Sequence, residues 1–218
     1  HGYLATGLTI MNADGSDIKR IEFSTLACMS PYVLDDGSIL FMRWEYNDKS
    51  LFDLQSLWTI NPDGTRVQLF YGNTITNPNV IWQAKSIPGT QKVLATLGPH
   101  HGHPVGAVGI IDRSLGTENT AAITNITPEY AYVPSKVYRH GGGPGDKQYK
   151  FAFRDPWPVK SDLFLVAYSD EALAQKNQHN SPNAYAIYLV DTLGGRELIY
   201  RDPQQSCFAP IPIHARVT

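Results

Sequence analysis

Long apolar runs are missing from this sequence of 218 residues. No stretch reaches the ~20 consecutive apolar residues that a membrane-spanning helix requires, so the sequence predicts no membrane span in this segment. An excess of charge of one sign is missing as well, because 18 Lys and Arg stand against 20 Asp and Glu, and no basic stripe runs along the chain. Nucleic-acid binding depends on clustered positive charge, so a nucleic-acid partner is not expected.

Cysteine is scarce, with Cys28 and Cys207 as its two occurrences. They could form one disulfide, although nothing in the sequence requires it. The chain opens with HGYLATG, without an initiator Met or a signal-peptide pattern. We therefore expect a piece of a longer protein whose compartment the segment itself does not reveal. Motifs of the G-x-S-x-G, H-E-x-x-H and kinase types are also missing, so no catalytic residue is predicted.

Turn-forming residues are abundant, with 18 Gly and 15 Pro. Between them lie short runs rich in Val, Ile, Leu, Phe and Tyr, which are typical of strands. Only residues 170–176 (DEALAQK) have a helical pattern. The sequence therefore predicts an all-β protein.

One hairpin pattern recurs along the chain. Aliphatic strands flank Asp14-Gly15, Asp63-Gly64 and Gly194-Gly195, and we expect these pairs to form two-residue turns with positive φ. The four copies of this hairpin cover residues 8–21, 57–70, 109–124 and 186–200. A second hairpin precedes three of the copies, at 30–44, 82–97 and 151–169.

Two consecutive hairpins make a four-stranded antiparallel unit. The first turns of the recurring hairpin lie roughly 50 residues apart along the chain, which is close to the length of a propeller blade. The expected architecture is therefore a partial β-propeller, with about three to four blades of a ring of about six. The predicted blades are 1–24 (partial), 25–77, 78–128, 129–205 and 206–218 (the start of the next). Cys28-Met29-Ser30-Pro31 and Cys207-Phe208-Ala209-Pro210 match in spacing, as if each opened a blade.

These units resemble a known family. LWTINPDGTRVQLF (57–70), preceded by SPYVLDDGSILF (30–41), is similar to the WD40-like PD repeat of TolB-type propellers. The chain resembles more closely the propeller middle domain of the hydrazine synthase alpha subunit family, through SPYVLDDGSILFMRWEY, LWTINPDGTRVQLFYGN, the histidine-containing strand with VGIIDRSLG, DLFLVAYS and IYRDPQQSCFAPIPIHAR.

The resemblance implies a scaffold and protein–protein interaction module of a larger, exported or periplasmic bacterial protein. Its partners would be flanking domains of the same polypeptide or protein subunits. The alternative is that the chain is part of a multihaem redox enzyme subunit and contributes a Cys or His ligand near a redox or metal centre. The chain has no Cys-x-x-Cys-His motif, so haem c would belong to flanking segments and no cofactor is expected within the chain itself.

His100, His101 and His103 form the strongest candidate site, because imidazole is the commonest transition-metal ligand near neutral pH. A zinc site would need a third or fourth ligand, which Cys28 could supply. The alternatives are a polar loop whose histidines cap backbone groups, or a hydrolase or lyase centre. The alternative to a metal ligand at Cys28 is a free thiol that packs as a small buried hydrophobic side chain.

Three further features have a structural and a functional interpretation. The turn aspartates, such as Asp14, would bind their own backbone two residues on, or less plausibly calcium. HGGGPGDKQ (140–148) would be an insertion rather than a phosphate loop. Arg154 and Trp157 would pack between blades or bind a partner.

Overall fold

The computed structural model describes residues 6–45, 49, 54–100, 105–129, 152–171 and 181–213. The chain begins with a small hairpin of β1 (Thr9–Ile10) and β2 (Lys19–Arg20). Twelve further strands form three groups of four. The first group contains β3 (Ala27–Val33), β4 (Ile39–Trp44), β5 (Gln55–Ile60) and β6 (Gln68–Tyr71), and the second contains β7 (Val80–Ser86), β8 (Val93–Gly98), β9 (Ala107–Ile111) and β10 (Ile123–Asn125). The third contains β11 (Ala152–Pro158), β12 (Leu163–Ser169), β13 (Ala186–Asp191) and β14 (Arg196–Tyr200). Two short 3-10 turns, Arg113–Leu115 and Thr120–Ala122, lie between β9 and β10.

Consecutive strands within each group pair antiparallel, and all seven predicted hairpins are confirmed. The three groups lie within the spans predicted for blades 25–77, 78–128 and 129–205. One parallel pair, Gln55 with Val80, joins the first group to the second, and an antiparallel bridge between Gly106 and Phe153 joins the second to the third. Most of the predicted helix at 170–176 lies outside the described residues.

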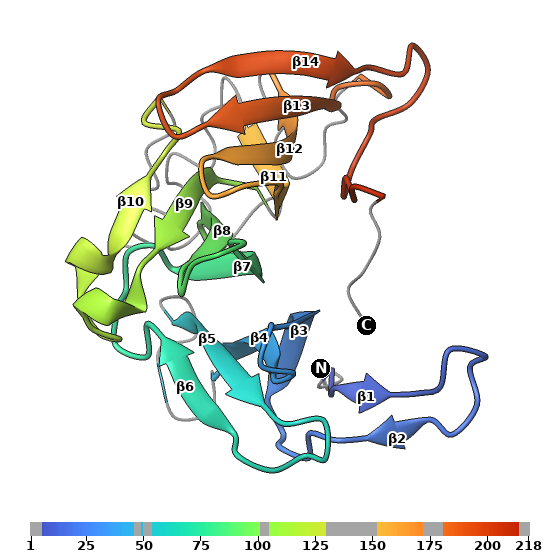
Figure 1. Cartoon of the computed structure of the whole chain (residues 1–218), viewed down its shortest axis with the longest axis vertical. Helices are drawn as coiled ribbons and strands as arrows, with labels where there is room; N and C mark the ends of the chain where they lie inside the picture. Colours follow the sequence, from blue (N-terminus) through green and yellow to red (C-terminus); the bar gives the residue numbers. More distant parts are fainter. Residues whose placement is uncertain are drawn as a thin grey trace.

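The three sheets are arranged around a common centre (Figure 1). The first strand of each sheet, β3, β7 or β11, lies nearest the middle, and the last, β6, β10 or β14, lies at the rim. The β1–β2 hairpin and residues 206–213 lie on the open side of this partial ring. Within the described ranges, no helix is long and apolar enough to cross a membrane.

The turns at Asp14-Gly15, Asp63-Gly64 and Gly194-Gly195 have three-residue loops rather than the predicted two. Asn12 N–H donates to Ser16 O, and Gly15 N–H donates to Asn12 O. Only the glycine has positive φ (83°), whereas a two-residue type I′ turn needs positive φ at both central residues. The aspartate prediction is confirmed: each turn carboxylate accepts from the N–H two residues on, at Ser16, Ser38, Thr65, Ser114 and Leu193.

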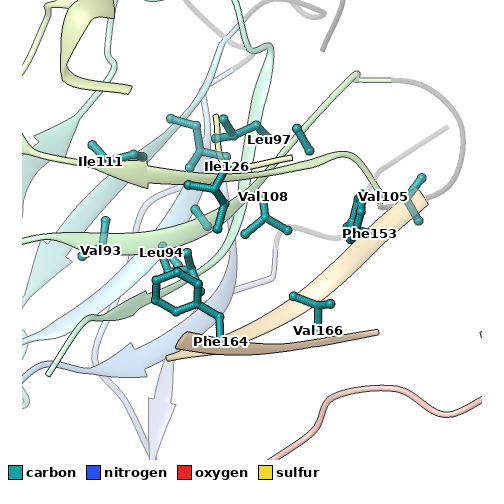
Figure 2. Close-up of a cluster of buried hydrophobic side chains, with 14 of the residues drawn as sticks. Val93, Leu94, Leu97, Val105, Val108, Ile111, Ile126, Phe153, Phe164 and Val166 are labelled. Carbon is teal, nitrogen blue, oxygen red and sulfur yellow. The ribbon is translucent and has the colours of Figure 1, made fainter. Parts of the chain in front are cut away.

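The apolar residues of neighbouring sheets form the core between them. All six residues of β8 are buried, because the β7–β10 sheet lies between the other two sheets and both of its faces are covered. Leu94 and Val108 contribute from one side and Phe153, Phe164 and Val166 from the other (Figure 2). A smaller cluster lies between the β1–β2 hairpin and the β3–β6 sheet, and contains Leu8, Ile21, Cys28, Ile39, Phe41 and Ile60.

Candidate functional site

Each innermost strand carries the same irregularity. The register between β3 and β4, β7 and β8, and β11 and β12 shifts at one point, where a β-bulge interrupts the pairing. At each shift one residue has left-handed φ: Ser30 (55°), Gln83 (55°) and Asp155 (51°). Ala209 (48°) has the same conformation in residues 206–213, so the predicted match between Cys28–Pro31 and Cys207–Pro210 extends to the backbone. Bulges of this kind change where the following side chains point.

The bulges of β7 and β11 bring a polar network together. Asp155 N–H donates to Gln83 Oε1 at 2.9 Å, and Gln83 Nε2 donates back to Asp155 Oδ1. Thr96 Oγ1 also donates to Gln83 Oε1, at 2.9 Å. Arg154 Nε lies 2.7 Å from Asp155 Oδ2. The buried Asp155 carboxylate therefore has a partner on both oxygens, as a buried charge requires.

Two residues beyond each left-handed position lies a large side chain, namely Tyr32, Lys85 and Trp157. The rings of Tyr32 and Trp157 contact edge to face, with centroids 6.2 Å apart, although their strands belong to the first and third sheets. Lys85 Nζ lies 5.4 Å from the centre of the Trp157 ring. Burial lowers the pKa of Lys85 to about 8, and the Asp155 charge opposes this only in part.

Arg154 and Trp157, the predicted binding residues, both lie in this region. The Arg154 guanidinium is 4.5 Å from the centre of the Phe208 ring, and Trp157 contacts Tyr32 and Lys85. We call the six residues together the inner-strand cluster: Tyr32, Gln83, Lys85, Arg154, Asp155 and Trp157. Sequence reasoning missed four of them, although aligning the first strand of every repeat would have placed Tyr32, Lys85 and Trp157 at one equivalent position.

Of the three predicted histidines the structure describes only His100, because His101 and His103 lie outside the described residues. His100 follows β8 by two residues, and its ring contacts Trp44 with centroids 5.2 Å apart. Among the residues that the structure describes, no three His, Cys, Asp or Glu side chains lie close enough to hold a metal ion. The metal site at these histidines stays a prediction.

Cys28 lies on β3 with 3% of its surface exposed. Burial first, and the neighbouring Glu22 carboxylate second, raise the pKa of its thiol to about 12. Metals bind the thiolate, so this environment disfavours Cys28 as a ligand at neutral pH. Cys28 and Cys207 are both free thiols, and the glycine-rich segment 140–148 lies outside the described residues.

Comparison with solved structures identifies the architecture. The chain is similar to Kuenenia stuttgartiensis hydrazine synthase over 90% of its length and 22% of that chain, at 19% identity and a TM-score of 0.63. It is also similar to a putative TolB from Agrobacterium tumefaciens over 90% of its length and 57% of that chain, at 9% identity and a TM-score of 0.56. The fold is that of a β-propeller.

The propeller spans less than two thirds of either structural neighbour. At these identities the likeness establishes the fold alone. No family model and no curated protein matches the sequence. The resemblance to TolB-type and hydrazine synthase propellers therefore holds for the architecture.

Proposed function

We propose that this chain is a β-propeller scaffold that holds flanking domains of the same polypeptide, or protein partners, through the open face of its β11–β14 sheet. An exported bacterial protein remains the expected context. The observation that carries the proposal is the uneven burial of β12. Phe164 and Val166 are buried, whereas the alternating Leu163 and Leu165 are only half-buried.

The strands around β12 share this exposure. Leu189 lies directly opposite Leu165 and is also half-buried, and all five residues of β14 are exposed. Ile211 and Ile213, in the segment that follows this sheet, are exposed, with 64% and 104% of their surface accessible. The β7–β10 sheet, in contrast, is covered on both faces. An exposed apolar surface of this kind is typical of a protein contact site, and propeller sheets are stabilised by contact with neighbouring sheets.

The test is a paired substitution, Leu165→Glu with Leu189→Lys, which puts opposite charges directly across the two strands. We expect the unsubstituted chain to bind the dye ANS and to self-associate in analytical ultracentrifugation. The double variant should lose at least half of both signals while it keeps its thermal unfolding transition. The matched control is Leu193→Lys, because Leu193 is 94% exposed in a turn.

Two results would overturn the proposal. One is an unsubstituted chain that is monomeric and does not bind the dye. The other is a double variant that unfolds like a core variant, since this would place Leu165 and Leu189 in a closed interior.

A further inference from the structure

Lys85 is a half-buried cation without a dedicated counter-ion. Its Nζ donates one hydrogen bond, to the carbonyl oxygen of Gln83 at 3.3 Å. A lysine ammonium has three donors, and in the described ranges Lys85 forms no ion pair. Two of its three donors are therefore open to a further acceptor.

The nearest acidic group does not fill this place. The Asp155 charge raises the pKa of Lys85. The two carboxylate oxygens of Asp155, however, already bind Gln83 and Arg154. Since Arg154 already balances the Asp155 charge, one positive charge remains uncompensated at Lys85. Burial disfavours that charge and lowers the pKa of the amine to about 8, which an anion beside it would reverse.

One aromatic ring lies against the ammonium, and a second ring packs on the first. The Trp157 ring lies on one side of the ammonium, and Tyr32 meets Trp157 at an angle of 81°. The Tyr32 hydroxyl accepts from Ser86 Oγ at 3.5 Å, on the residue that follows Lys85. Tyr32, Lys85 and Trp157 are each half-buried, so part of each side chain is accessible to solvent.

We propose that Lys85, Tyr32 and Trp157 form a binding site for a small organic carboxylate. The two open donors of the ammonium match the two oxygens of a carboxylate, and the rings of Trp157 and Tyr32 would pack on its apolar body. One uncompensated charge fits a monoanion, whereas a phosphate dianion would need further donors. This site adjoins the proposed scaffold surface, because Trp157 of β11 pairs directly with Leu165 of β12, but its test depends on Lys85 and not on Leu165 or Leu189.

The experiment follows the Trp157 indole N–H in a ¹H–¹⁵N NMR spectrum, assigned with Trp157→Phe. Benzoate is the probe, benzamide is its neutral analogue, and inorganic phosphate is the anion without an apolar body. We expect a saturable shift with benzoate, at least tenfold weaker binding of benzamide, and no saturable shift with phosphate. Lys85→Met should weaken benzoate binding at least tenfold, and Tyr32→Phe a few-fold.

The matched control is Lys92→Met, which removes an exposed lysine of the β7–β8 loop that pairs with Asp112 and should leave benzoate binding unchanged. Benzoate affinity should also fall about tenfold between pH 7 and pH 9 as the Lys85 ammonium loses its proton. Among the described residues, the charged group that acts on Lys85 is Asp155 of β11, which pairs with Arg154.

The proposal is overturned if benzoate gives no saturable shift, or if benzamide binds as tightly as benzoate. It is equally overturned if folded Lys85→Met binds benzoate like the unsubstituted chain, or if Lys92→Met loses as much affinity as Lys85→Met. The last result would indicate binding through overall charge.

Discussion

Replacing Lys85 with Met should stabilise the protein at neutral pH, and the size of the gain can be worked out from the structure. The pKa of Lys85 falls from 10.5 to about 8 on folding, mainly because of burial. At 1.36 kcal/mol for each pKa unit, this corresponds to at most about 3 kcal/mol of stability lost at pH 7. Lys85 is partly exposed, so solvent screening reduces the expected loss to about 1–2 kcal/mol.

The sign of the pH dependence follows from proton binding. Between about pH 8 and pH 10.5 the unfolded chain holds a proton on Lys85 that the folded chain has released. The free energy of unfolding therefore rises with pH in this window for the native sequence. Lys85→Met removes this rise, so its advantage should be complete below about pH 8 and should disappear by about pH 10.5.

The assay is urea unfolding of the native sequence, Lys85→Met and Lys92→Met at pH 7 and pH 10.5. At each pH, the free energy of unfolding of each variant is compared with that of the native sequence. The change in this difference between pH 7 and pH 10.5 is the measured result, because the contributions of other titrating groups cancel in it. Lys92 is exposed and forms a surface ion pair, so its variant should show little change. A Lys85→Met difference that does not depend on pH, or that favours the native sequence more at pH 7, would refute the reasoning.

Three further predictions concern the fold. Gly106→Ala should cost about 3 kcal/mol, because its Cβ would lie 1.9 Å from the backbone oxygen of Leu97; an unchanged melting temperature would contradict this close approach. Phe164→Ala should lower the free energy of unfolding by about 3–5 kcal/mol in urea titrations, since Phe164 is fully buried, and a loss below about 1 kcal/mol would argue against this packing. Ellman's reagent should modify half-buried Cys207 before Cys28, whose thiol becomes reactive only on unfolding; equal rates in the native protein would disprove the assigned burial.

Hairpins could be predicted because they depend on local patterns. Alternating aliphatic runs around Asp14-Gly15 and Asp63-Gly64 predict strand, turn and strand within about fifteen residues, and the structure has all seven hairpins. The loop length was wrong because the Asp14 carboxylate accepts from Ser16 N–H, which favours a three-residue loop with glycine alone at positive φ.

The candidate site was harder to predict, because its contacts join strands of different sheets. Trp157 and Arg154 were expected from residue type, but nothing near them in sequence indicates Lys85 or Tyr32. Contacts between Gln83 and Asp155 span 72 positions, and the contact between Tyr32 and Trp157 spans two sheets. Of the three histidines between β8 and β9, the structure describes only His100.

The all-β class, the hairpins and their repetition follow from the amino-acid sequence alone, because strand periodicity and turn chemistry act over a few residues. Tertiary contacts determine which side chains meet, because Tyr32 and Lys85, each beyond a bulge of its own strand, both contact Trp157 of a different sheet. They also determine which apolar residues stay open: Leu165 on β12 and Leu94 on β8 are both strand leucines, yet only Leu94 has a neighbouring sheet over it.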